Sequence, residues 1–177
     1  MSPEVVEATI VLAARARRLA RRPAGAPTVA SLDLLVFELG CERYAIETRH
    51  VREVVRGAAL TPVPGTDDFV LGLTNLRGEL VPVVDLRRLL GTTAAEVTLA
   101  SSLVILGDER AQLGVLTDAV HDVSTVPTQA IADVTASSEA TREHLRGVTR
   151  EGLVILSGES LLANTRLVLE TTDEPGA

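Results

Sequence analysis

The side chains that could act as nucleophiles, bases or metal ligands are few and lie far apart along the sequence. Cys41 is the only cysteine, and the three histidines are His50, His121 and His144. No two of these histidines stand four residues apart with a glutamate between them, as in a zinc-binding helix. Cys41 and His50 could form a nucleophile and its base, but Cys41 lies in an expected hairpin turn with no helix terminus nearby to activate its thiol.

A second group, Asp118, His121 and Asp122, has the residue types of a metal site. On an alternating strand Asp118 and Asp122 share one face while His121 points to the other. The serines beside Gly158 do not form a nucleophile elbow, because glycines do not flank either serine. Nothing assembles an acid, a base and a nucleophile. We therefore expect a protein that is not an enzyme, with no catalytic residues, no metal and no cofactor.

The basic residues exclude further classes of protein, because all 17 are arginines and the chain has no lysine. A P-loop, a protein kinase and a Schiff-base enzyme each need a lysine. The net charge is −7 and aromatic residues make up 2% of the chain, a composition that disfavours nucleic-acid binding. No apolar run approaches the roughly 20 residues that span a bilayer. We expect a cytoplasmic protein with no nucleic-acid partner and no direct membrane insertion.

The segment Phe69–Leu90 predicts a β-hairpin followed by a short helix. The turn, Asn75–Glu79 (NLRGE), has its glycine where a positive φ is wanted. Leu80–Val84 has the valine content of a returning strand and is expected to be core. Leu86–Leu90 has helical spacing and stops before a glycine. A large cation, Arg77, therefore stands at the tip of an otherwise apolar hairpin.

The two ends of the chain differ from the middle. Residues 1–22 predict an amphipathic helix and carry five arginines against two glutamates, whereas the rest of the chain carries 12 arginines against 22 acidic residues. This helix could dock on the body, bind a partner or lie on a membrane surface. Residues 23–31 (PAGAPTVAS) form a linker, residues 32–165 the main domain and residues 166–177 a C-terminal tail.

The two halves of the main domain resemble each other, which indicates an internal duplication. We expect a mainly β fold of two small lobes, at about 32–90 and 101–165 but not strictly separable, each with about five short strands around a shared core. A short helix is expected around Ser138–Leu145. The matched segments are Leu35–Gly40 with Leu103–Gly107, Gly72–Thr74 with Gly147–Thr149, Leu80–Val83 with Leu153–Leu156, and Leu89–Leu90 with Leu161–Leu162.

Residues 32–165 resemble the CheW-like adaptor family of bacterial chemosensory systems. The resemblance rests on LVFELGCERYAIE, HVREVVR, TPVPG and, above all, FVLGLTNLRGELVPVVDLRRLLG. The second half matches more loosely, through LGVLTDAVHDV and LRGVTREGLVILSGESLLA. The resemblance implies two SH3-like five-stranded β-barrels around a common hydrophobic core, with the N-terminal helix as an addition.

The resemblance also implies a non-catalytic scaffold that couples methyl-accepting chemoreceptors to a CheA-type histidine kinase at membrane-associated receptor arrays. The family's receptor-coupling glutamate and arginine correspond to Glu53 and Arg77, with Val51 in the receptor-facing surface. Asn75 and Gly78 are expected to shape the exposed end around Arg77. Two other functions fit the sequence: a kinase-binding decoy without receptor coupling, and a small-ligand-binding β-barrel module.

A purely structural role for Glu53 and Arg77 is also open. The two residues could form an ion pair between neighbouring strands. An exposed pair of this kind contributes only about 0–1 kcal/mol, which is too little to be needed for folding.

Overall fold

The computed structural model describes residues 30–91, 101–134, 139–164 and 166–167. The expected N-terminal helix, most of the linker and the tail beyond residue 167 lie outside the described residues. The β-strands are β1 (Ser31–Leu39), β2 (Glu42–Glu47), β3 (Val51–Arg56), β4 (Val70–Leu76), β5 (Glu79–Val84), β6 (Ser102–Leu106), β7 (Leu113–Thr117), β8 (Ala119–Pro127), β9 (Ile131–Ala132), β10 (Leu145–Thr149) and β11 (Val154–Leu156). The helices are η1 (Thr48–His50), α2 (Leu86–Leu90), η2 (Thr128–Ala130), α3 (Glu139–Glu143) and α4 (Gly158–Ala163).

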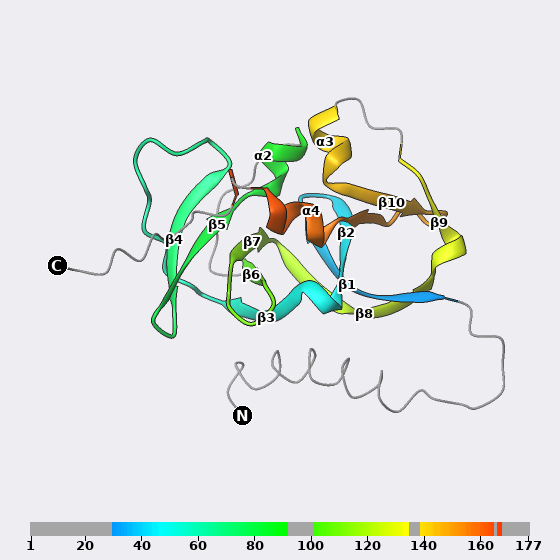
Figure 1. Cartoon of the computed structure of the whole chain (residues 1–177), viewed down its shortest axis with the longest axis horizontal. Helices are drawn as coiled ribbons and strands as arrows, with labels where there is room; N and C mark the ends of the chain where they lie inside the picture. Colours follow the sequence, from blue (N-terminus) through cyan, green and yellow to red (C-terminus); the bar gives the residue numbers. More distant parts are fainter. Residues whose placement is uncertain (1–29, 92–100, 135–138, 165, 168–177) are drawn as a thin grey trace.

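The strands form two sheets, which we call lobe I and lobe II. Lobe I has the strand order β3-β6-β7-β5-β4, and lobe II has the order β8-β1-β2-β11-β10-β9. The two lobes lie side by side, with α2 and α4 near their junction (Figure 1). The expected mainly β fold of two small barrel lobes is confirmed, and α3 falls within the helix expected around Ser138–Leu145.

The two sheets interleave the two halves of the chain, so their membership differs from the ranges 32–90 and 101–165. Each lobe takes one hairpin from the other half of the chain: β1–β2 joins lobe II, and β6–β7 joins lobe I. The exchanged hairpins are held by parallel pairing, β7 with β5 and β2 with β11. Strand pairing between distant segments leaves no periodic signal in the sequence, so the duplication could be read but the exchange could not.

The duplication itself is visible in the strand registers. Val84 pairs with Val115 in lobe I, and Leu156 pairs with Ile46 in lobe II. Val115 is the counterpart of Ile46, which lies 69 positions earlier in the sequence. The residues that pair with them are therefore also counterparts, so Leu156 corresponds to Val84, 72 positions earlier. The sequence match of Leu153–Leu156 with Leu80–Val83 was therefore one residue out of register. A one-residue slip moves every side chain to the opposite face of a strand.

Each barrel is closed by backbone pairing between a hairpin and a distant segment. The segment after β3 pairs with the β4–β5 hairpin in lobe I, and the segment after β8 pairs with the β10–β11 hairpin in lobe II. In lobe I the backbones of Thr61 and Leu73 exchange two hydrogen bonds of 2.8 Å. In lobe II β9 pairs with Val148 and its neighbour on β10. A glycine precedes each closure: an added Cβ at Gly72 would lie 2.3 Å from the Thr61 carbonyl oxygen, and one at Gly147 would meet β9 at a similar distance.

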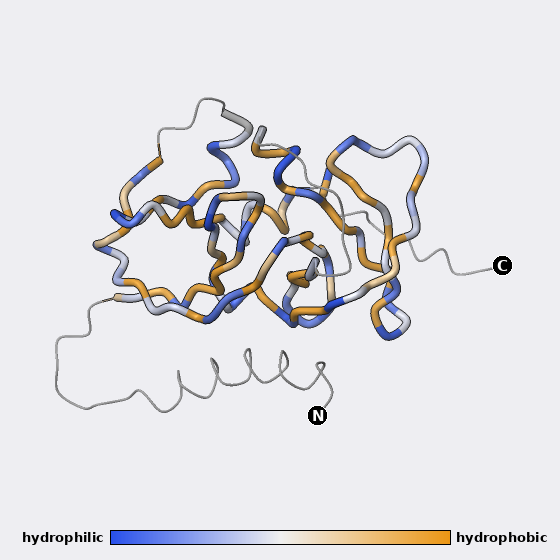
Figure 2. The backbone as a smooth tube through the Cα atoms, turned by 180° about the vertical axis from the view of Figure 1, so that it is seen from behind, coloured by the Kyte–Doolittle hydropathy of each residue, from blue (hydrophilic) through white to orange (hydrophobic). Residues whose placement is uncertain are grey.

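The hydrophobic core has one shared part and two separate parts. The shared part lies between the lobes and draws on both, and it includes Phe37 from β1, Val51 from β3 and Leu113 from β7. Each barrel also has its own interior, around Leu34 in lobe II and around Leu103 in lobe I. Apolar positions follow the strands through the middle of both lobes (Figure 2). The expectation of a shared core is therefore confirmed.

Two small helices end the two repeats in the same way. Asp85 caps α2 by accepting a hydrogen bond from the Arg87 backbone N–H, and Ser157 caps α4 by accepting one from the Ser160 N–H. Gly91 ends α2 in the left-handed conformation, as the sequence predicted. Among the described residues, no helix is long and apolar enough to cross a membrane.

Candidate interaction site

The tip of the β4–β5 hairpin is a two-residue turn in which both residues adopt a positive φ. Leu76 pairs with Glu79, and the two residues between them are Arg77 (φ 53°) and Gly78 (φ 94°). Two consecutive positive φ values are typical of a type I′ turn, which matches the twist of the flanking strands. The sequence predicted the positive φ at the glycine. It gave no sign of the positive φ at Arg77, since arginine rarely adopts it.

Asn75 stabilises this turn from within. Its side-chain oxygen Oδ1 accepts a hydrogen bond of 2.8 Å from the Gly78 backbone N–H. A side chain that bonds the backbone of its own turn fixes the loop geometry without a contact from elsewhere in the fold. Asn75 and Gly78 therefore shape the tip, as expected from the sequence.

Arg77 and Glu53 form a two-pronged ion pair. Nη1 and Nη2 of Arg77 each donate to one carboxylate oxygen of Glu53, both at 2.8 Å. The side chain of Arg77 is 75% exposed and that of Glu53 is 18% exposed. The expected ion pair is therefore present, but its strands are not hydrogen-bonded neighbours. β3 and β4 are the two edge strands of lobe I, so the pair joins opposite edges of a curled sheet.

Two further contacts tie the same end of lobe I together. Arg52, next to Glu53 on β3, donates to the backbone carbonyl of Glu109 in the β6–β7 turn. Glu79, just after the hairpin tip, accepts a hydrogen bond of 3.2 Å from the Ala111 N–H in that turn. The hairpin tip, the β6–β7 turn and β3 are therefore cross-linked, and they hold the Arg77 guanidinium in one orientation at the surface.

The other expected site residue, Val51, is not on the surface. Its side chain is 1% exposed and packs in the shared core, because the pleat of β3 turns Val51 and Val54 inward. Leu80, expected to be core, is 54% exposed. The next four residues, Val81–Val84, are buried as expected. The tip region thus presents Arg77, Asn75 and the apolar side chain of Leu80, and Glu53 lies behind Arg77.

A buried cation that the sequence did not single out joins the two lobes. The side chain of Arg87 is 0% exposed; its Nε donates to Asp85 at 2.7 Å, and its Nη1 donates to both carboxylate oxygens of Asp118 at 2.9 Å. Asp118 also accepts a hydrogen bond of 2.6 Å from the Gly40 N–H in the β1–β2 turn. The only sequence signal was an Asp two residues before an Arg, and the distant Asp118 could not be assigned to it.

Two of the three residues considered as metal ligands, Asp118 and His121, have other partners. Asp118 binds Arg87, and the His121 ring contacts Glu38 at 2.9 Å. Within the described ranges, no three His, Cys, Asp or Glu side chains are grouped so that they could hold a metal ion. His144 is 2% exposed and lies between the Ser160 hydroxyl at 3.0 Å and the Asn164 amide at 3.1 Å. Burial lowers the pKa of His144, so the neutral ring is favoured there.

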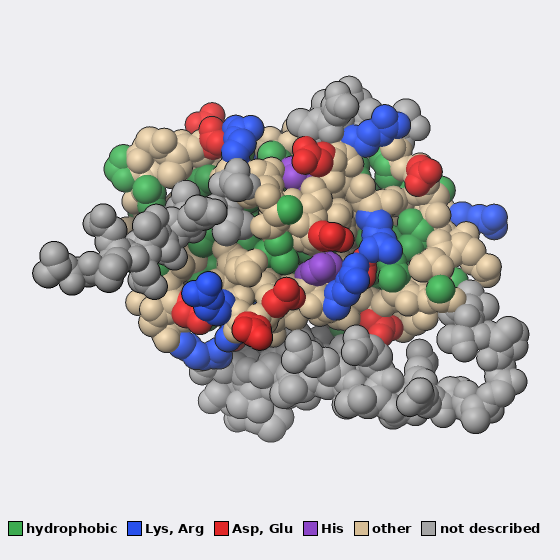
Figure 3. Space-filling view, viewed as in Figure 1, with side chains coloured by type: hydrophobic (Ala, Val, Ile, Leu, Met, Phe, Trp, Pro, Cys, Tyr) green, Lys and Arg blue, Asp and Glu red, His purple; other side chains and the backbone are tan. Residues whose placement is uncertain are grey.

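The charged side chains on the face shown in Figure 3 are of both signs and are interspersed. Two small barrels around a shared core, with a cross-linked hairpin tip at the surface, define a two-barrel interaction module.

Comparison with known proteins agrees with this class. The model of the CheW-like domain family matches residues 33–166, so the chain belongs to this family. It is 33% identical over 117 residues to the chemotaxis protein CheW of Rhizobium meliloti, covering 66% of this chain and 76% of that protein. It is 31% identical over 139 residues to the protein FrzA of Myxococcus xanthus, covering 76% and 87%. The scaffolding protein CheW of Thermoanaerobacter tengcongensis has a similar crystal structure, with a TM-score of 0.65, 26% identity, and coverage of 72% of this chain and 90% of that chain.

Proposed function

We propose that this chain is a non-catalytic scaffold that couples methyl-accepting chemoreceptors to a CheA-type histidine kinase in a bacterial chemosensory pathway. It would act in the cytoplasm and be recruited to membrane-associated receptor arrays. Family membership supports the proposal, because relatives with this domain are named as chemotaxis and scaffolding proteins. The receptor-binding residues that we propose are Glu53, Asn75, Arg77 and Gly78.

The observation that carries the proposal is the conformation of Arg77. A left-handed φ costs an ordinary residue roughly 1–2 kcal/mol, and an exposed ion pair returns only about 0–1 kcal/mol. The pair with Glu53 is therefore a poor explanation for an arginine at this position if folding is its only role. The strain and the pair together fix a planar, five-donor group at the surface, which is suited to carboxylate and carbonyl acceptors on a partner. Backbone strain of this kind is found at binding sites more often than elsewhere.

Co-sedimentation with receptor-containing membranes and with the kinase tests the proposal. The chain should bind both partners and should increase the amount of kinase recovered with the receptor. Arg77→Ala should abolish recovery with the receptor while kinase binding in solution persists. Arg77→Lys keeps the charge and loses the fork, so it should behave like Arg77→Ala if the two-pronged geometry matters.

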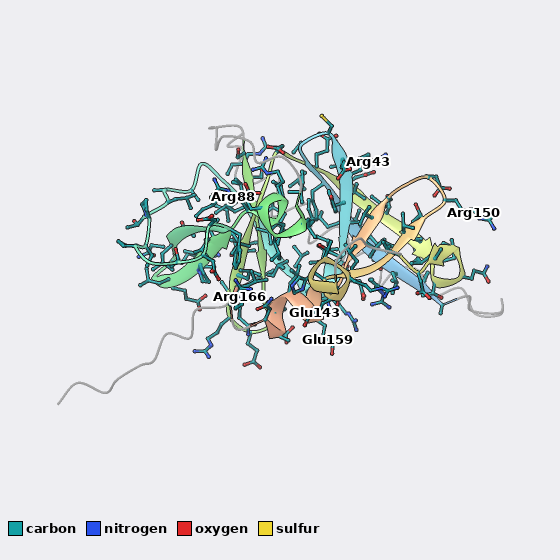
Figure 4. The ribbon with its side chains drawn as sticks, turned by 90° about the horizontal axis from the view of Figure 1, so that it is seen from above. Arg43, Arg88, Glu143, Arg150, Glu159 and Arg166 are labelled. Carbon is teal, nitrogen blue, oxygen red and sulfur yellow. The ribbon has the colours of Figure 1, made fainter. Side chains whose placement is uncertain are left out.

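The matched control is Arg88→Ala, because Arg88 is an exposed arginine whose Nη1 donates to the Asp68 carbonyl, on the loop before β4. Arg88 lies on α2 and is labelled in Figure 4. This variant should couple normally. Binding to the kinase alone would instead identify a decoy, and binding to neither partner would contradict the proposal and favour a ligand-binding module.

A further inference from the structure

The corresponding ends of the two barrels differ in one respect that the duplication makes visible. In lobe I the β4–β5 tip, the β6–β7 turn and β3 are cross-linked by the side chains of Arg77, Arg52 and Glu79. Their counterparts in lobe II are the β10–β11 tip, the β1–β2 turn and β8. In lobe II the Gly40 N–H of the β1–β2 turn donates to Asp118, which directly precedes β8, but among the described residues no side-chain hydrogen bond joins the β10–β11 tip to either of these segments. Instead they surround an open cavity of about 610 Å³.

The difference follows from hairpin length. β4 and β5 have seven and six residues and a two-residue turn, so their tip reaches across the barrel to β3. β10 and β11 have five and three residues, and their tip ends short of the opposite wall. The cavity is lined by Cys41, Glu42, Arg43, Ser124, Thr125, Val126, Thr149, Glu151, Gly152, Leu153 and Val154.

The lining combines an apolar floor with a charged rim. Val126 and Leu153 pack against the interior core of lobe II, so the floor continues that core. The rim carries the carboxylates of Glu42 and Glu151 and one cation, Arg43. Figure 4 shows Arg150 at the tip of the β10–β11 hairpin, pointing away from the body of the molecule. A segment with apolar side chains and several arginines would match both the floor and the acidic rim.

We propose that the N-terminal segment of this chain, residues 1–29, occupies this cavity. The segment joins the described chain at Ala30, whose carbonyl accepts hydrogen bonds of 2.9 Å from Thr128, two residues beyond the cavity wall at Val126. Residues 1–29 carry five arginines and two glutamates, a net charge of +3, while the rest of the chain carries −10. The segment supplies apolar residues for the floor, among them Ile10, Leu12 and Leu19. It lies outside residues 33–166, which the family model matches, so the interaction belongs to this chain and not to the domain in general.

Occupation from within the same chain has a direct consequence. A tethered segment has an effective concentration in the millimolar range, so even weak contacts keep the cavity filled. A partner that needs this end of lobe II must first displace the segment. The lobe I end, with Arg77, stays accessible throughout.

The single natural cysteine provides the test, because Cys41 is exposed and lies on the cavity rim. New cysteines are placed one at a time in the full chain, by Val11→Cys, Leu12→Cys, Ala13→Cys and Ala14→Cys. Disulfide formation with Cys41 is followed in dilute solution on non-reducing gels, with oxidised glutathione added as the oxidant. If the segment binds in one position, one or two of the new cysteines should react at least about tenfold faster than their neighbours. The length of the connecting chain alone would not do this, because it changes the effective concentration at Cys41 only slightly over four residues. At the fastest position Glu151→Arg should slow the reaction several-fold, and the control Glu109→Arg, on the other lobe, should not.

Three outcomes would overturn the proposal. Rates that change smoothly from position 11 to position 14 would show that the segment is linked to the domain but does not bind in the cavity in a defined position. Covalent dimers whose yield rises with protein concentration would assign the cavity to a second copy of the chain. Equal effects of Glu151→Arg and Glu109→Arg would show that only the overall charge acts. None of these outcomes bears on receptor coupling through Arg77, which is measured separately.

Discussion

Replacing Arg77 by glycine separates the cost of its backbone conformation from the benefit of its ion pair. Glycine adopts a φ of 53° without strain, which returns roughly 1–2 kcal/mol. The change loses an ion pair of about 0–1 kcal/mol, because Arg77 is 75% exposed and the pair is screened by solvent. Glycine also makes the unfolded chain more flexible, which costs about 0.4–1 kcal/mol. These effects nearly cancel, so the free energy of unfolding of Arg77→Gly should lie within about 1 kcal/mol of the parent value.

The assay combines urea unfolding with thermal unfolding of the full chain. A change of about 1 kcal/mol corresponds to about 2–4 °C in Tm for a protein of this size. Arg77→Ala keeps the strain and loses the pair, so it should be no more stable than Arg77→Gly. Gly78→Ala is the internal control: its φ is 94° and an added Cβ would meet nothing within 4 Å, so only strain is introduced. That variant should lose roughly 1–2 kcal/mol.

A loss of more than about 2 kcal/mol in Arg77→Gly would refute the reasoning, because the cross-link to Glu53 would then be holding the barrel together. If stability is preserved and co-sedimentation with the receptor is lost, Arg77 acts at the interface. The two measurements together distinguish a structural residue from a binding residue.

Three further predictions concern the framework. Gly72→Ala should cost at least about 3 kcal/mol in urea unfolding, because its Cβ would lie 2.3 Å from a backbone oxygen. Gly65→Ala, with open space around it, should cost only roughly 1–2 kcal/mol, and equal losses would contradict the barrel closure. Arg87→Met should cost about 3–5 kcal/mol by leaving two carboxylates without their buried cation, and a loss below 1 kcal/mol would show that the network is dispensable. Burial lowers the pKa of His144 and His50, so the unfolded chain takes up their protons at a higher pH than the folded chain. Stability should therefore be full above about pH 6.5 and should fall as the pH drops from there towards the lowered values, and His144→Gln should reduce that slope.

Local features of the fold were predictable because they depend on residues close together in the sequence. The hairpin, the end of α2 at Gly91 and the helix near Glu139–Glu143 each follow from a turn glycine, a cap or a helical spacing. The matched segments of the two halves revealed the duplication for the same reason. The hairpin exchange was not predictable, since parallel pairing of β7 with β5 joins segments that do not adjoin in sequence.

The candidate site shows the same division. Asn75 and Gly78 were assigned to the turn by residue type, and the turn is as expected. The assignment of Val51 to the surface failed, because it was taken from a position in a motif and not from the inward or outward direction of a strand. The prediction that Leu80 is buried was also wrong, because a valine-rich strand suggests burial of every residue along it. The contact of Arg87 with Asp118 links residues 31 positions apart, and no local pattern specifies which acid would be the partner.

The two lobes derive from one repeat, so differences between them indicate where each has been adapted. The framework features are shared: the capped helices, the glycines before each closure and the parallel pairing occur in both lobes. The difference lies at one end of each barrel, where lobe I extends its hairpin into a strained, cross-linked arginine tip and lobe II keeps a short hairpin around an open cavity. The coupling proposed above would need two different ends on one core. Lobe I offers a fixed cation at its tip, and lobe II offers an open cavity.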